Sequence, residues 1–329
     1  MRKMKSAKFI GVLTVALALA YSPIAVADSS DNGAMGSEGN NSSKTFQSDG
    51  NSVSNPEFDS HGNTASKIYK SIRGDNPYGV PNYAQARTPG VTSNGINYHS
   101  GAVMNGSAGT KVNLVWYGTT WTDAQKTIIK TMINGLNGSP YFNINTTYYG
   151  AGNVAIKNIV SVGTETSTGY TLGKNLSDAN ILSLAQTNLG DVNTMTLVLT
   201  DGAVSESSGF LTKYCGWHTW TGNSKYGFIG NPLSSTACSA QSKSPNGDAG
   251  VDAMASVIAH EIEETVTDPL GNGWFDSRGY ENGDKCAWKF GTTLAGPNGS
   301  TYNVTLGGSK YLIQQNWVNA SGGFCSISR

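Results

Sequence analysis

The sequence predicts an α/β domain, in which a mixed sheet is flanked by helices and followed by a loop-rich, disulfide-bonded C-terminal part. Short runs of β-branched and aromatic residues alternate with runs of helical spacing between residues 111 and 202. A strand–helix–strand order of this kind favours a sheet that is at least partly parallel. Beyond residue 202 the chain becomes rich in Gly, Ser and Asn, and it holds all the cysteines: Cys215, Cys238, Cys286 and Cys325.

The first half of the domain should contain three strands and two helices. KVNLVWYG and TMTLVLTDG are apolar runs typical of buried strands. Polar caps begin both helices, and Gly138 and Pro140 end the first. The expected elements are a strand at 111–118, a helix from Thr122 or Asp123 to Leu136, a strand at 153–163, a helix from Ser177 or Asp178 to Leu189, and a strand at 194–202.

The second half should contain one long helix and several short strands. Residues 225–229 read as a strand, which we expect at an edge of the sheet where it could pair with an extended peptide. A helix should run from 250 to 267, because Pro269 stops it. Strand-like runs follow at 302–306 and 310–318.

The N-terminus reads as a secretory signal. Four basic residues precede an apolar run, and Ala25-Val26-Ala27 matches the small-x-small cleavage pattern, so residues 1–27 should be removed. No later stretch is long enough to span a bilayer. Residues 28–95 are Ser/Asn/Gly-rich at first and form a disordered leader or pro-segment, which leaves 96–329 as a single globular domain.

Charge and cysteine usage fit an extracellular protein. Signal removal takes four of the 22 basic residues and none of the 22 acidic ones, which leaves 18 against 22. This mildly acidic balance gives no sign of nucleic acid or an anionic membrane as partner. Four cysteines in a secreted chain imply two disulfides with three possible connectivities. We favour Cys215–Cys238 and Cys286–Cys325, because each closes a loop-rich segment.

The stretch IAHEIEETVTDP (258–269) holds the residues of a candidate metal site. It nearly spells His-Glu-x-x-His, a zinc-hydrolase signature, with Glu264 where the second histidine would stand. At 100° per residue, His260 and Glu264 lie one turn apart on one face, with Glu261 on the flank. An imidazole and a carboxylate could therefore converge on one ion. The alternative is an exposed pair that stabilises the helix by about 0.2–0.5 kcal/mol.

A zinc site needs a third ligand, and the loop after Pro269 offers carboxylates. We expect His260, Glu264 and Glu281 to bind zinc and Glu261 to act as the catalytic base, with His218 and Asp284 as additional candidates. A mixed sheet flanked by helices, with the 250–267 helix under the cleft, would make the fold zincin-like. A carboxylate in place of an imidazole makes harder ions more competitive, so calcium is the alternative cofactor. A purely structural calcium clip would use Asp268, Asp276, Glu281 and Asp284.

Four segments, in order, resemble the EXORDIUM/phosphate-induced protein family. They are YHSGAVMNGSAGTKVNLVWYG, SPNGDAGVDAMAS, TVTDPLGNGWFDS and KYLIQQNWV with the later GGFC, and the resemblance covers residues 96–329. The chain looks like the microbial branch, which carries a zincin-like HExxE motif, the TDP turn and a following E-x-x-D-x-C. The resemblance implies an extracellular or cell-wall location and no established reaction.

Two functions compete on this basis. The first is a secreted metal-dependent hydrolase, most plausibly a zinc peptidase-like enzyme that acts on an extracellular peptide. The second is a non-enzymatic extracellular or cell-wall-associated protein of the EXORDIUM type, which binds a wall component and in which the His/Glu cluster is structural. The seven tryptophans and fifteen tyrosines could offer stacking surfaces for sugars in that case.

Overall fold

A five-stranded sheet lies at the centre of residues 95–329, which the computed structural model describes. The strand order is β3-β2-β5-β8-β7. All neighbours pair in parallel except β7, which runs antiparallel to β8, so the predicted mixed α/β sheet is confirmed. The expected signal peptide and, apart from Gly95, the expected leader lie outside the described residues. The strands are β2 (Thr110–Tyr117), β3 (Val160–Thr168), β5 (Thr194–Thr200), β7 (Gly216–Thr221) and β8 (Ser224–Gly230).

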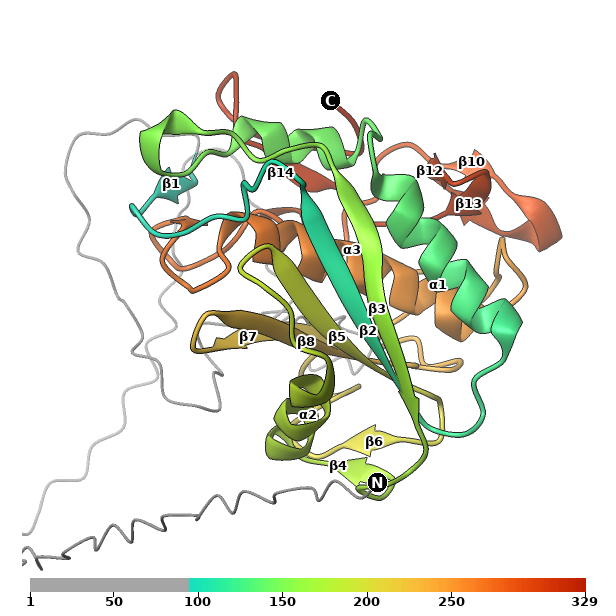
Figure 1. The fold of residues 1–329 in the computed structure, drawn as a ribbon. Helices are drawn as coiled ribbons and strands as arrows, with labels where there is room; N and C mark the ends of the chain where they lie inside the picture. The colour runs from blue at the N-terminus through green and yellow to red at the C-terminus, as the bar shows by residue number, and fades with distance from the viewer. Residues whose placement is uncertain (1–94) are drawn as a thin grey trace, which may run out of the picture. The chain divides into compact units, whose positions relative to one another are not determined.

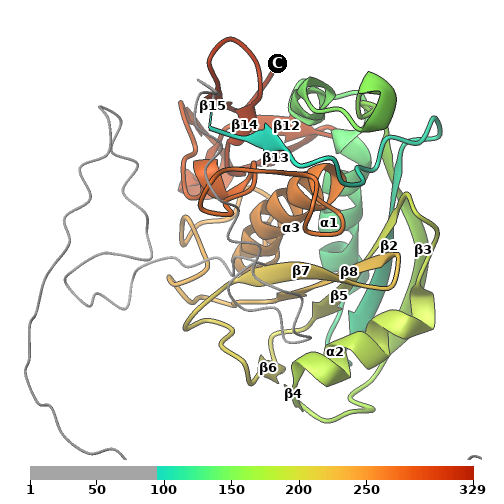
Figure 2. The same cartoon turned by 90° about the vertical axis from the view of Figure 1, so that its left-hand side faces the viewer.

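Helices cover both faces of the sheet (Figures 1 and 2). Helices α1 (Asp123–Leu136) and α3 (Ala249–Thr267) pack on one face, and α2 (Asp178–Ala185) packs on the other. The predicted caps are present: the side chains of Thr122 and Ser177 each accept a backbone N–H from the first turn of their helix. The three helices and the sheet therefore form three layers.

Alternation along the strands builds a core on each side of the sheet. In β5, Leu197 and Leu199 pack towards α1 and α3, whereas Val198 packs towards α2. In β7, Trp217 packs on the α2 side with Tyr226 and Phe228. Because both faces are buried, these strands read in the sequence as continuous apolar runs.

Two expectations about strands were wrong. The second strand begins at Val160 rather than at residue 153. Asn153, the first residue of the expected range, ends a 3₁₀ turn and has a positive φ of 59°. As a half-exposed outer strand of Ser and Thr, β3 has no apolar run to mark its end. Strand β8 lies between β5 and β7 and is not an edge; among the described strands, β7 takes that place.

The C-terminal part is loop-rich, as predicted, and two disulfides fasten it. They join Cys215 to Cys238 and Cys286 to Cys325, the pairing that the sequence favours. No helix among residues 95–329 is long and apolar enough to cross a membrane. The remaining pieces are β1 (Asn97–Tyr98), η2 (Phe142–Thr147), η3 (Ala151–Asn153), β4 (Asn175–Leu176), η4 (Gln186–Asn188), β6 (Ser205–Glu206), β9 (Trp274–Phe275), η5 (Asp284–Cys286), β10 (Leu294–Ala295), η6 (Pro297–Gly299), β11 (Thr301–Tyr302), β12 (Val304–Leu306), β13 (Ser309–Tyr311), β14 (Asn316–Val318) and β15 (Phe324–Ser326).

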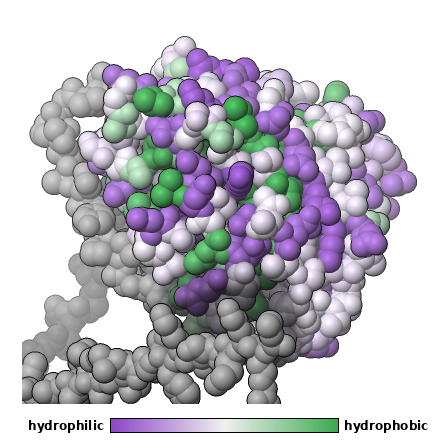
Figure 3. Space-filling view, in the orientation of Figure 1, coloured by the Kyte–Doolittle hydropathy of each residue, from purple (hydrophilic) through white to green (hydrophobic). Residues whose placement is uncertain are grey.

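The face of the domain drawn in Figure 3 carries hydrophobic residues in small groups, separated by hydrophilic ones. Large apolar side chains with substantial exposure are scattered through the sequence, for example Val192, Leu233 and Leu294. Single exposed apolar residues are ordinary on a folded domain and carry no functional signal by themselves. The chemistry of the site therefore has to be sought in the buried polar residues.

Shortening a buried side chain of the central strand β5 should destabilise the fold. Leu197 is fully buried between β2, β8 and the α1/α3 layer, so Leu197→Ala should lower the free energy of unfolding by about 2–5 kcal/mol through lost contacts and a cavity. Urea denaturation with the disulfides intact measures this. Val192, which is 63% exposed, is the control, since Val192→Ala should change the free energy by less than about 0.5 kcal/mol. Equal effects of the two substitutions would contradict the placement of β5.

Candidate metal centre

Helix α3 is buried on all sides, including its polar face. The Asp248 side chain caps its first turn by accepting the Val251 N–H. His260, Glu261 and Glu264 are each at most 3% exposed. The sequence alternative, in which His260 and Glu264 form a solvated surface pair, is therefore wrong. Burying several ionisable groups without compensation costs far more than a surface pair contributes, so their surroundings have to be explained.

The strand β7 brings His218 to the polar face of α3. Because successive side chains alternate, Trp217 packs towards α2 and His218 points to the opposite side, where α3 lies. Helix and strand approach closely: a Cβ built on Gly216 would lie 2.6 Å from Val257 Cγ1. His218, an additional candidate in the sequence, therefore lies against the carboxylates of α3.

The loop 281–284 closes the other side of the site. The Asn282 side-chain amide donates to the carbonyl of Glu263 at 3.0 Å, which docks the loop onto α3. The Asp284 N–H donates to Glu264 Oε1 at 2.9 Å, so two candidate ligand residues lie side by side. Glu281, the first residue of this loop, is fully buried.

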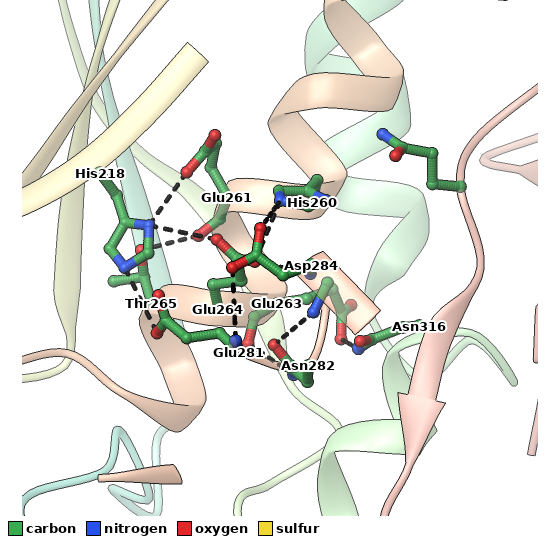
Figure 4. A network of polar contacts seen from close by, with 12 residues as sticks. His218, His260, Glu261, Glu263, Glu264, Thr265, Glu281, Asn282, Asp284 and Asn316 are labelled. Atoms are coloured by element: carbon green, nitrogen blue, oxygen red, sulfur yellow. Dashed lines mark hydrogen bonds and ion pairs between the residues drawn. The ribbon is translucent and has the colours of Figure 1, made fainter. Parts of the chain in front are cut away.

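Two groups of metal-ligand type meet at Glu264 (Figure 4). In one, His260 Nε2 lies 3.0 Å from Glu264 Oε1 and 3.8 Å from Asp284 Oδ1. In the other, His218 Nδ1 lies 3.6 Å from Glu264 Oε2, and His218 Nε2 lies 3.8 Å from Glu281 Oε1. Figure 4 shows the Glu264 carboxylate between the two histidines. A single side chain thus belongs to both groups.

Glu261 lies beside the two groups and belongs to neither. Its Oε2 is 2.9 Å from His218 Nδ1, a distance that fits a hydrogen bond donated by the imidazole N–H. This contact fixes the orientation of the His218 ring. It also keeps the Glu261 carboxylate within the same buried volume as Glu264, where it could exchange a proton with a bound molecule.

Burial and the neighbouring carboxylates shift the pKa values of groups in the cluster. Burial lowers the pKa of His260, but the carboxylates of Glu264, Glu261 and Asp284 outweigh it and raise that pKa to about 9. Burial raises the pKa of Asp284 well above its ordinary value, and the negative charge of Glu264 adds to this. Without a bound cation, His260 and Asp284 therefore favour their protonated forms.

Two supporting residues were missed by sequence reasoning. Glu263, fully buried on α3, accepts a hydrogen bond from the Asn316 side chain in β14, and burial raises the pKa of Glu263 well above its usual range. At Gly283, an added Cβ would lie 2.9 Å from His260 Nδ1 and 3.0 Å from Glu264 Oε1. The glycine in E-N-G-D is the only sequence signal that could have pointed to this close approach.

The structure divides the expected ligand set. His260 and Glu264 lie together as expected, but Asp284 rather than Glu281 completes their group, and Glu281 faces His218 instead. The calcium clip does not assemble. The carboxylates of Asp268 and Asp276 accept backbone N–H groups of their own loop, and neither belongs to the two groups.

The metal-free protein should lose stability at alkaline pH. The pKa of His260 is about 9 in the fold and 6.5 as a reference, so its contribution, on the order of 3 kcal/mol, is complete below pH 6.5 and is lost as the pH rises through 9. The raised pKa of Asp284 acts in the same direction. Urea midpoints at pH 6 and pH 9.5, with a chelator present, measure the loss. His260→Asn should reduce it, and a midpoint that stays constant with pH would contradict this account.

Adding a side chain at Gly283 should destabilise the fold. Its φ of −68° suits any residue, so Gly283→Ala acts only through the clash with His260 and Glu264 and should cost about 1–3 kcal/mol. Gly169→Ala is the matched control, because its added Cβ meets only the end of the Thr119 side chain at 3.3 Å. Denaturation curves that place both variants within about 0.5 kcal/mol of the parent would show that the loop does not press on the site.

Comparison with known proteins gives the chain a family. The family model described as "Phosphate-induced protein 1 conserved region" matches residues 96–326. Protein EXORDIUM-like 3 of Arabidopsis thaliana is 32% identical over 273 residues, which cover 68% of this chain and 80% of that protein. Protein PHOSPHATE-INDUCED 1 of Nicotiana tabacum is 28% identical over 215 residues, 55% of this chain and 67% of that protein. No solved structure matches the chain. The match takes in the five-stranded sheet, Glu261 and the five residues of the two ligand groups, and the chain belongs to the EXORDIUM/phosphate-induced protein family.

Proposed function

We propose that this protein is a secreted, metal-dependent hydrolase of the zinc peptidase-like kind. The observation that carries the proposal is the buried carboxylate of Glu264, which lies within 3.0–3.6 Å of a histidine nitrogen on each side. Histidine and carboxylate groups that converge in this way are the usual ligands of a divalent transition metal. The HExxE sequence on a buried helix beneath a mixed sheet supports the comparison with zinc hydrolases.

The metal ion would be held by His260, Glu264 and Asp284. The first two project from α3 one turn apart, and the third comes from the loop that donates its own N–H to Glu264. A mixed nitrogen and oxygen set suits zinc, and three protein ligands leave a position for a water molecule or a substrate. Two carboxylates among the three ligands make calcium the alternative ion.

The remaining groups fit hydrolysis. A bound zinc ion lowers the pKa of a coordinated water towards neutrality. Glu261 would accept the proton from that water, since it is buried, ionisable and belongs to neither ligand group. His218, held by Glu261 at 2.9 Å, would orient that carboxylate. The chain thus supplies a base and a residue that positions it.

Secretion has its own support. The signal-like N-terminus and the pairing of all four cysteines in two disulfides both favour an oxidising, extracellular compartment. An extracellular peptide is the substrate class that a zinc peptidase-like site implies there.

A second candidate is a non-enzymatic extracellular or wall-associated protein in which the cluster is structural. One observation favours it: the raised pKa values of His260 and Asp284 let protons neutralise part of the buried charge without any metal. Neighbouring Glu263 shows that this chain does bury a carboxyl for structural reasons, bonded to Asn316. Such a protein would bind a wall polysaccharide through surfaces away from the cluster.

Two substitutions separate these functions. Glu264→Ala should lower the metal content of the purified protein at least tenfold, because it removes the central ligand. Glu261→Gln should keep the metal and remove activity. Elemental analysis measures the metal, and mass spectrometry of a peptide library incubated with the protein measures cleavage. Glu165→Gln, on the opposite edge of the sheet and bonded to Lys130, is the control and should change neither.

The alternative makes the opposite forecast. If Glu264→Ala leaves metal content, stability and cleavage unchanged, the metal-dependent hydrolase is wrong. The non-enzymatic function is supported instead by a different result. In that case the parent cuts no peptide and binds wall polysaccharide, and Glu261→Gln binds the polysaccharide equally well.

A further inference from the structure

The two ligand groups share Glu264 without sharing an oxygen. Glu264 Oε1 is the atom 3.0 Å from His260, on the side of Asp284. Glu264 Oε2 is the atom 3.6 Å from His218, on the side of Glu281. A carboxylate that presents one oxygen to each of two histidines has the arrangement of a bridging ligand rather than of a ligand to one ion.

The spacing within each group fits a coordination shell. Ligand atoms at the corners of a tetrahedron, with metal–ligand bonds of about 2.1 Å, lie about 3.4 Å apart. The observed separations around His260 Nε2 are 3.0 and 3.8 Å. His218 Nε2 lies 3.8 Å from Glu281 Oε1, whereas Glu264 Oε2 lies 3.6 Å from the other ring nitrogen, Nδ1. The His260 group therefore needs only small shifts of its side chains to enclose an ion. The ligand atoms of His218, Glu264 and Glu281 lie within 4.8 Å of one another, and here the Glu264 side chain has to move towards Nε2.

The imidazole of His218 is oriented as a ligand. Its Nδ1 lies 2.9 Å from Glu261 Oε2, so the N–H at that position is directed to a carboxylate. The ring then presents its other nitrogen, Nε2, towards Glu281 at 3.8 Å. Metal-binding histidines commonly use this carboxylate–imidazole pairing, which fixes the tautomer and increases the basicity of the ligating nitrogen.

The charge of the cluster calls for more than one dication. The carboxylates of Glu261, Glu264, Glu281 and Asp284 all lie within the buried cluster, each 2.9–3.8 Å from a histidine nitrogen. With neutral, metal-ligating histidines, four ionised carboxylates carry a charge of about −4, which a single dication leaves half uncompensated. Two dications would balance it.

We infer that the site holds two divalent cations bridged by Glu264. One is bound by His260, Asp284 and Glu264 Oε1, and the other by His218 Nε2, Glu281 and Glu264 Oε2. This inference rests on the proposed function and deepens it, because paired ions about 3.5–4 Å apart can stabilise both the attacking and the leaving oxygen of a hydrolysed bond. The nitrogen and oxygen ligands suit Zn²⁺, Mn²⁺ or Co²⁺.

Metal stoichiometry tests the inference. The full secreted chain is stripped with a chelator, dialysed against Zn²⁺ and analysed for zinc per protein, and the parent should hold two ions per chain. His218→Asn and Glu281→Gln should each hold one. Mn²⁺ loading adds a second readout, since two bridged ions give an exchange-coupled paramagnetic resonance signal and the single-ion variants give the six-line signal of isolated Mn²⁺.

A matched histidine serves as control. His99 stacks on Phe275 and belongs to neither ligand group, so His99→Asn should keep two ions. Near-ultraviolet circular dichroism checks the fold of every variant. If His218→Asn does not fold, Glu281→Gln tests the same ion, because it removes one carboxylate charge at nearly constant shape.

The outcomes separate this inference from the proposed function. One ion in the parent, lost with His260→Asn and kept with His218→Asn, would overturn the second ion and leave a one-metal hydrolase. Two ions in the parent and also in both His218→Asn and Glu281→Gln would overturn the assigned ligands. No bound ion in the parent would overturn the inference and the proposed function together.

Discussion

The burial of the Glu264 carboxylate between two histidines is the constraint on which the site depends. An ionised carboxylate moved out of water costs several kcal/mol unless cations, protons or hydrogen bonds compensate it. Here the compensation comes from three separate segments: α3 itself through His260, β7 through His218, and the 281–284 loop through the Asp284 N–H. These segments have to be held in register before the site exists at all.

Both disulfides lie where that register is needed. Cys215 directly precedes β7, three residues before His218, and Cys286 ends the 3₁₀ turn that Asp284 begins. The first bridge thus anchors the start of the edge strand that carries His218, and the second anchors the turn that carries Asp284. The contacts of Asn282 with Glu263, and of Glu263 with Asn316, add a polar link between α3, the loop and β14.

The sequence allowed much of the scaffold to be predicted and only part of the site. Runs such as 194–202 identify β5 because a strand buried on both faces is continuously apolar, whereas the Ser/Thr-rich β3 lacks that signal. Helical periodicity placed His260 beside Glu264, since their neighbourhood is local. The partners of His218 depended on the strand order and on which face of β7 meets α3, and neither is encoded by spacing.

The glutamate that replaces the second histidine of the zinc-hydrolase signature then has a physical consequence. An imidazole at position 264 would offer a single nitrogen to a metal on one side, with its other nitrogen available only for a hydrogen bond. A carboxylate offers two equivalent oxygens and one more negative charge, so it can face His260 and His218 at once. The replacement therefore does more than alter the affinity of one ion: it joins the groups around the two histidines into a single charged cluster. Occupancy of the site by cations and stability of the fold become coupled, because the same carboxylates that would bind the ions are those whose burial the fold has to offset.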